Sequence, residues 1–228
     1  MSASSALLGL LRLASPALPV GGFSYSDALE AAVDASLVQD APTAQGWLAE
    51  QLTLSLTRGD LPLVHHAWQA WASADFETVG HCNTWFFSTR ETHEFRLQTQ
   101  QMGRSLCEWM HQLNLAPDSH RRALLELQPA PCWPVAFALA AWQTGATARE
   151  GLLAYAFSWA ENAVAAAIKS VPLGQTAGQR ILAHLAERIE QGVERSLQCP
   201  WPDLQSFTPG LAILSSRHET QYSRLFRS

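Results

Sequence analysis

Hydrophobic positions recur at helical spacing along almost the whole chain, and strand-like alternation is nearly absent. Apolar residues three and four positions apart fall on one face of a helix, as Leu48, Leu52 and Leu56 do. The segments with this spacing are 6–13, a segment from Ser24 or Ser26 to 35, 43–57, 63–71, 75–86, 88–113 as one helix or two, 118–127, 134–145, 147–170 and 176–193. The pattern predicts an all-α fold, a single-domain bundle of roughly ten helices over residues 1–228.

The longest apolar stretch covers residues 152–189 and is interrupted at 172–174, where Pro172 and Gly174 stand. Its first half is almost entirely small or aromatic, so we expect a helix there that is buried nearly all round. Lys169 lies in this half and is the only lysine of the chain. A buried ammonium would need a partner, which makes Lys169 a candidate contact residue; a lysine that extends its head group to water is the alternative.

Helix ends are indicated by capping residues and by turns. Thr147 and Glu150 have the spacing of a capping box, and residues 176–179 offer a second one. We expect the helix over 43–57 to end at residues 58–60, and the prolines and glycines of 16–22 to form a fixed turn.

Composition changes this picture in one respect. Hydrophobic residues make up 47% of the chain and charged residues only 15%, against about 25% charged in typical globular chains. Together with nine tryptophans, the small number of charges indicates that part of the surface contacts other proteins rather than water.

The charge and cysteine pattern excludes several classes of function. A net charge of −5 gives no basic surface for nucleic acid. The four cysteines are isolated, which indicates neither a zinc ribbon nor a disulfide framework and fits a reduced cytoplasmic setting.

The first residues lack a positively charged region, so we expect no signal peptide. Residues 127–148 are uncharged, but their prolines favour a buried helix over a membrane span.

No catalytic motif or cofactor motif is convincing. Residues 22–26 resemble a nucleophile elbow, but Ser26 stands at its last position and no strand precedes it. Residues 173–176 lack the lysine of a phosphate-binding loop. Cys107 with His111, and the pairs at 65–66 and 81–82, could suggest a soft metal site, although packing explains them more simply. We therefore predict no enzyme, no cofactor and no metal ligand.

Two polar segments remain as candidate sites. The run from Arg90 to Arg96 places Arg90 and Glu94 four apart, which fits either a solvated helix face or a partly buried polar network. In the C-terminal tail, residues 211–228, Tyr222, Leu225 and Phe226 have helical spacing and lie among arginines. Aromatic residues and arginines often anchor interfaces. We favour a partner-binding tail over one that folds back on its own core.

These stretches together resemble the UreF family of urease accessory proteins. The resemblance covers almost the whole chain and rests on long segments, namely 10–33, 60–63, 90–94, 158–175 and 217–228. Asp27 and Ala28 stand where Gln-Gly is common in that family.

The resemblance implies an all-helical, cytoplasmic homodimer without catalytic chemistry. Its implied partners are the accessory protein UreD, also called UreH, the GTPase UreG and the urease apoprotein, into which nickel is incorporated. The residues that it implicates in partner binding are Phe23, Tyr25, Glu30, Lys169, Arg217, Glu219, Tyr222, Arg224, Leu225 and Phe226.

Two further functions stay open at this point. The chain could regulate the partner GTPase by supplying an arginine, with Arg217 or Arg224 as candidates. It could also carry nickel itself through its histidines.

Overall fold

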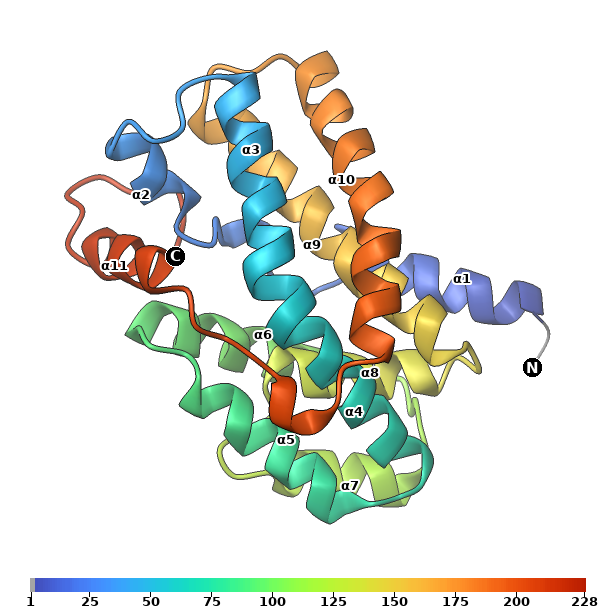
Figure 1. Cartoon of the computed structure of the whole chain (residues 1–228). Coiled ribbons are helices and arrows are strands. Elements are labelled where there is room, and N and C mark those ends of the chain that lie inside the picture. Colours follow the sequence, from blue (N-terminus) through green and yellow to red (C-terminus); the bar gives the residue numbers. More distant parts are fainter. Residues whose placement is uncertain (1–2) are drawn as a thin grey trace.

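The computed structural model describes residues 3–228, so the first two residues of the predicted domain lie outside it. The described chain is helical with no strand among these residues, which confirms the all-α prediction (Figure 1). In chain order the helices are α1 (Ala3–Ala14), α2 (Leu29–Asp34), α3 (Ala41–Gln51), α4 (Leu61–Ala72), α5 (Phe76–Ser88), α6 (His93–Gln112), α7 (Asp118–Glu126), α8 (Trp133–Trp142), α9 (Ala148–Ser170), α10 (Gln175–Leu197) and α11 (Pro209–His218). Short 3₁₀ turns, η1 (Gly22–Ser24) and η3 (Trp201–Asp203), join some of them.

The helix buried on nearly all sides is α8, not α9 as predicted. Every residue of α8 from Pro134 to Ala141 is buried, and α4 and α6 pack against it. In α9 the apolar residues are divided between a buried face and a half-exposed one, and Phe157 is 39% exposed. Alanine has little apolar surface, so an alanine of α9 that stays half-exposed gives up little hydrophobic free energy.

The helix predicted to end at residues 58–60 does not end there. A π-helical segment, η2 (Leu52–Asp60), joins α3 to α4 without a break, and Gln51 and Leu61 both keep right-handed helical dihedrals. Position 59 has no room for a side chain, because an added Cβ would lie 2.9 Å from the main-chain oxygen of Gln205, so glycine stands within the helical segment. Long π-helical turns are uncommon and often occur beside functional sites.

Capping residues set the helix starts in most cases. The Thr147–Glu150 capping box is present at the start of α9, and Asp75 caps α5 through the N–H of Thr78. The capping box expected at residues 176–179 is wrong, because α10 already begins at Gln175. Its N-cap residue is Gly174, which makes no side-chain capping hydrogen bond. Within 88–113, Ser88 ends α5, residues 89–92 lie outside a helix, and a single helix, α6, follows, which Thr92 caps.

The helix expected from Ser24 or Ser26 begins only at Leu29. Asp27 and Ala28 both adopt positive φ, 51° and 61°. L-residues avoid this left-handed region, which explains why glycine suits position 28. The kink turns α2 toward residues 219–228 of the C-terminal tail, which lie beside it together with α11 (Figure 1).

Candidate partner-binding site

The N-terminal turn and the end of the chain lie side by side. The N–H of Ser26 donates to the main-chain oxygen of Ser228 at 2.8 Å, and the N–H of Arg227 donates to the oxygen of Ser24 at 2.9 Å. The Ser26 hydroxyl also donates to the Ser228 oxygen. These bonds fix the last residues of the chain against the turn that precedes α2.

Glu30, in the first turn of α2, holds the tail through its carboxylate. One oxygen accepts from the N–H of Leu225 at 2.7 Å, and the other accepts from the N–H of Phe226 at 3.0 Å. Glu30 is only 7% exposed. A buried carboxylate is costly unless it accepts hydrogen bonds, and these two amides satisfy that need.

His218, at the end of α11, lies between two carboxylates. Its Nδ1 is 2.7 Å from Glu94 of α6, and its Nε2 is 3.1 Å from Glu30. The His218 side chain is fully buried. Arg224 donates to the second oxygen of Glu94 at 2.8 Å. We call this set of four side chains, Glu30, Glu94, His218 and Arg224, the tail network.

Glu219 binds the N-terminus of α6. Its carboxylate accepts from the N–H of His93 at 3.0 Å and from the N–H of Glu94 at 3.3 Å. Free N–H groups at a helix N-terminus favour a negative charge. Glu219 thus fixes the residue after α11 to the same helix end that supplies Glu94.

Two aromatic residues of the predicted site are buried. Phe226 is 6% exposed, and the Lys169 Nζ lies 5.6 Å from its ring centroid. The Tyr25 hydroxyl donates to Gln101. Burial raises the pKa of Tyr25, and a hydrogen bond and the charge of Arg227 oppose that rise.

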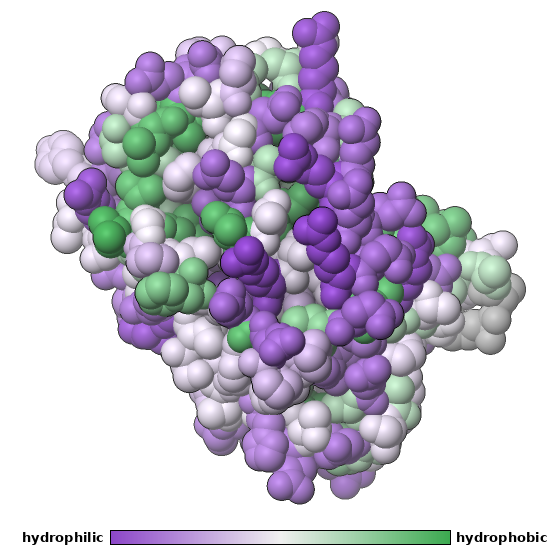
Figure 2. All heavy atoms as spheres, viewed as in Figure 1, coloured by the Kyte–Doolittle hydropathy of each residue, from purple (hydrophilic) through white to green (hydrophobic). Residues whose placement is uncertain are grey.

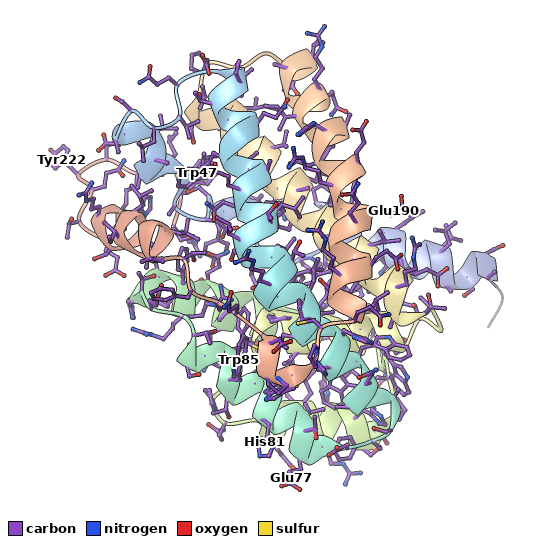
Figure 3. The ribbon with its side chains drawn as sticks, viewed as in Figure 1. Trp47, Glu77, His81, Trp85, Glu190 and Tyr222 are labelled. Carbon is purple, nitrogen blue, oxygen red and sulfur yellow. The ribbon has the colours of Figure 1, made fainter. Side chains whose placement is uncertain are left out.

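Three apolar residues around the tail network are exposed. Phe23 is 58% exposed, Leu225 70% exposed, and Tyr222 has as much exposure as a free residue. Figure 3 shows Tyr222 pointing away from the molecule at its left edge. On the face drawn in Figure 2, hydrophobic side chains gather on the upper left, where Figure 1 places α2 and α3.

A cavity of about 110 Å³, lined by both polar and apolar side chains, lies under the N-terminal turn. Asp27 lines it and accepts from Gln98 at 2.6 Å and from the Trp159 indole at 3.0 Å. Burial raises the pKa of Asp27, although these hydrogen bonds oppose the rise. Asp60 also lines the cavity, where it pairs with Arg90 at 2.8 Å.

Two buried atoms of the cavity wall, Gln51 Oε1 and Arg90 Nε, have no partner within residues 3–228. A cavity of this size has room for water molecules beside these two polar atoms.

The structure brings most of the predicted site residues together. Direct contacts join the residues Tyr25, Glu30, Lys169, Glu219, Arg224, Leu225 and Phe226 to the tail or to the helices that hold it. Phe23 and Arg217 are exposed and make no described side-chain hydrogen bond or ion pair. Lys169 is exposed, so it needs no buried partner.

The helical spacing of the tail is misleading. Helix α11 ends at His218, and residues 219–228 form turns and bends. The tail therefore divides its side chains between the core, as with Phe226, and the solvent, as with Tyr222. Whether the exposed part binds a partner stays a prediction.

The segment from Arg90 to Arg96 takes part in partly buried polar contacts, but Arg90 and Glu94 do not pair with each other. Arg90 precedes α6 and pairs with Asp60, whereas Glu94 pairs with His218 and Arg224. The helix starts too late for Arg90 and Glu94 to share a face.

Sequence reasoning missed His218, Ser26 and Gln98. His218 stood within the tail segment that carried the resemblance, but nothing in its neighbours indicated burial. Its two partners are 124 and 188 positions away. Only the tertiary fold reveals the site.

No group of three or more His, Cys, Asp or Glu side chains in residues 3–228 has the arrangement of a metal site. His81 is exposed while Cys82 beside it is buried, and His66 instead contacts the main-chain oxygen of Cys199 at 3.1 Å. In the same part of the chain, no helix has the length and apolar character needed to cross a membrane.

These features define an all-α bundle whose distinctive site is a tail held against an N-terminal turn. Comparison with known proteins identifies the family. The family model UreF matches residues 38–186. This chain belongs to the UreF family of urease accessory proteins.

Several curated relatives carry the name urease accessory protein UreF. The protein from Methylibium petroleiphilum is 57% identical over 225 residues, which cover 99% of this chain and 95% of the relative. The protein from Polaromonas sp. is 55% identical over 225 residues, with 99% and 96% covered. The protein from Paracidovorax citrulli is 54% identical over 226 residues, with 99% and 90% covered. The chain is thus an accessory protein of urease maturation and not an enzyme.

Proposed function

We propose that this chain is a scaffold that binds the accessory protein UreD (UreH) and the GTPase UreG, and promotes nickel incorporation into urease apoprotein in the cytoplasm. Family membership supports the role in urease maturation. The observation that carries the partner-binding part is the fixed tail, which holds Tyr222 and Leu225 exposed while Phe226 is buried.

This arrangement suits protein binding for a physical reason. Exposed aromatic and leucine side chains gain free energy when a partner covers them. Tail residues that are already hydrogen-bonded to Glu30 lose less conformational entropy on binding than a free segment would. We propose that Phe23, Tyr222 and Leu225 contact the UreD-type partner.

The test is urease maturation in a cell that lacks its own copy of this gene. The wild-type chain should restore nickel content and activity of urease. The Tyr222→Ala/Leu225→Ala variant should restore little of either, whereas a Leu125→Ala variant, which changes an exposed leucine on α7, should behave as wild type. Full activation by the double variant would refute the role of the tail.

We also propose that the chain is a homodimer, as the resemblance implies. The protomer has a mass of 25.0 kDa, so light scattering should give about twice that value. A mass equal to one protomer at micromolar concentration would contradict it.

A second candidate function is regulation of the partner GTPase, and Arg217 favours it over Arg224. Arg217 is exposed without a described side-chain partner, while Arg224 is bound to Glu94. An arginine supplied to a nucleotide site must be free to reach it. If this function exists, wild-type protein should accelerate GTP hydrolysis by the partner and Arg217→Ala should not; no acceleration by wild type would end the idea.

A further inference from the structure

A surface groove of about 440 Å³ lies between η2, the last turn of α10 and the segment that follows α10. Helix α10 packs against η2, and Figure 1 shows the end of α10 leading into η3. Two arginines line the groove, Arg58 from η2 and Arg195 from α10, together with Thr57 and Asp203. We call it the arginine groove. It shares no residue with the tail network or with the cavity under the N-terminal turn.

The two arginines of the groove have no carboxylate partner. In the described part of the chain, four other arginines pair with carboxylates, but Arg58 and Arg195 do not. Arg58 donates one long hydrogen bond, from Nη1 to Oε1 of Gln205 at 3.4 Å. A guanidinium always carries its positive charge and has five N–H donors. Because both residues are exposed, most of these donors are available to a ligand in the groove.

The charge of the groove differs from that of the whole chain. Asp203 is the one acidic residue that lines it, and no ion pair within residues 3–228 involves Asp203. Two arginines and one aspartate give the lining a net charge of +1, whereas the chain has a net charge of −5. The groove therefore favours an anion, and its one carboxylate favours a ligand that also has a hydrogen-bond donor.

Hydrogen bonds join the walls of the groove and fix its shape. The N–H of Gln205 donates to the main-chain oxygen of Arg58 at 2.9 Å. The Ser196 hydroxyl donates to the main-chain oxygen of Thr57 at 3.1 Å. These bonds connect η2 both to α10 and to the segment after it. A site with fixed walls loses less conformational entropy on binding than a loop that must first become ordered.

We propose that the arginine groove binds a small phosphate ester that carries a hydroxyl group. The guanidinium groups of Arg58 and Arg195 donate to the phosphate oxygens, because their planar set of N–H groups matches the geometry of a phosphate. The hydroxyl group of the ligand donates to Asp203. The volume of the groove lies within the range of small-molecule sites, about 300 to 1,000 Å³, which favours a small molecule over a protein surface.

The first test is calorimetric titration of the full-length protein with glycerol 3-phosphate at neutral pH and low salt. Binding should be saturable, with a Kd below about 1 mM, and glycerol without the phosphate should not bind. No saturable binding of glycerol 3-phosphate up to about 10 mM would overturn the proposal. The test uses the isolated chain and no partner, so its failure would leave the proposed scaffold role untouched.

Arginine variants test where the ligand binds. Arg58→Gln and Arg195→Gln should each weaken binding at least about tenfold, because each removes charge-assisted hydrogen bonds. Both residues are exposed, so an unchanged Tm should show that the fold is kept. The control is Arg180→Gln, which removes the same charge from α10 outside the groove and should bind as the wild type does. Equal losses in all three variants would show only a general attraction for anions and would refute the site.

Asp203→Ala tests the contact with the hydroxyl group. The wild type should bind glycerol 3-phosphate more tightly than inorganic phosphate. The variant removes a negative charge and an acceptor, so inorganic phosphate should bind more tightly to it and the preference for the ester should disappear. An unchanged ratio of the two Kd values would refute the proposed ligand class.

Discussion

The carboxylate of Glu30 accepts a hydrogen bond from the N–H of Phe226 at 3.0 Å, across 196 positions of the chain. This contact and its neighbour at Leu225 join the first turn of α2 to the end of the tail. Because the Phe226 ring is buried and Tyr222 is exposed, the contacts of this one side chain of α2 help to determine which tail residues face the solvent.

Glu30→Ala should free the tail. The variant leaves two amides and the His218 ring without an acceptor, so we expect a loss of about 2 to 4 kcal/mol in the free energy of unfolding. Urea denaturation measures this loss. Glu50→Ala, on the exposed face of α3, should change stability by less than about 0.5 kcal/mol. Equal effects of the two changes would contradict the anchoring role of Glu30.

Arg90→Ala should destabilise the protein far more than Arg149→Ala. Arg90 and Asp60 form an ion pair with side chains only 13% and 14% exposed, and removal of one partner of a buried pair costs about 3 to 5 kcal/mol. Arg149 pairs with Glu190 and Glu194 at the surface, where such pairs are worth about 0 to 1 kcal/mol. Thermal unfolding of both variants tests the difference, and a similar shift in Tm would argue against it.

Gly103 of α6 should not tolerate a side chain. A Cβ at this position would lie 2.0 Å from the main-chain oxygen of Pro131, so Gly103→Ala must push α6 away from the residues that precede α8. We expect a loss of more than about 2 kcal/mol. Gly46→Ala is the matched control, because α3 is open there and alanine should stabilise it by about 0.5 to 1 kcal/mol. Two similar changes in stability would show that α6 can move without cost.

The four cysteines should react with an alkylating reagent in a fixed order. Burial raises the pKa of Cys82 to about 12 and that of Cys107 to about 11, and it also raises the pKa of Cys132. With a pKa of about 12, roughly one thiol in 10⁴ is ionised at pH 8, and only the thiolate reacts. Cys199 is the one cysteine that is partly exposed.

Mass spectrometry of native protein at pH 8 should therefore find label on Cys199 first, and on all four cysteines after denaturation. The order should hold as the pH rises to 9, since Cys82 stays protonated there. Early labelling of Cys82 or Cys132 would show that the core opens more readily than its packing implies.

Much of the fold could be predicted from local patterns, since helical spacing, the Thr147 capping box and the Asp75 cap all depend on residues near one another. The errors occurred where distant contacts overrule local signals. Arg58-Gly59-Asp60 looks like a helix end, but Gln205 packs against Gly59 and Arg90 pairs with Asp60, so the helix continues. The burial of α8 rather than α9 likewise depends on which helices pack around each of them.

The candidate site, too, could be predicted only in part from the sequence. Glu30 and the tail could be named from the resemblance, but their direct contact could not. His218 gave no local signal because both of its partners belong to other helices. The helical spacing of Tyr222, Leu225 and Phe226 predicted one apolar face, whereas the hydrogen bonds to Glu30 hold these residues in an irregular turn that separates them.

The most direct measurement of the central claim is capture of a co-expressed UreD-type partner by the tagged full-length chain. The account predicts that Tyr222→Ala/Leu225→Ala reduces capture at least tenfold while helicity by circular dichroism stays unchanged, and that Leu125→Ala captures as much as the wild type. Undiminished capture by the folded double variant would contradict the claim that the exposed part of the tail binds the partner.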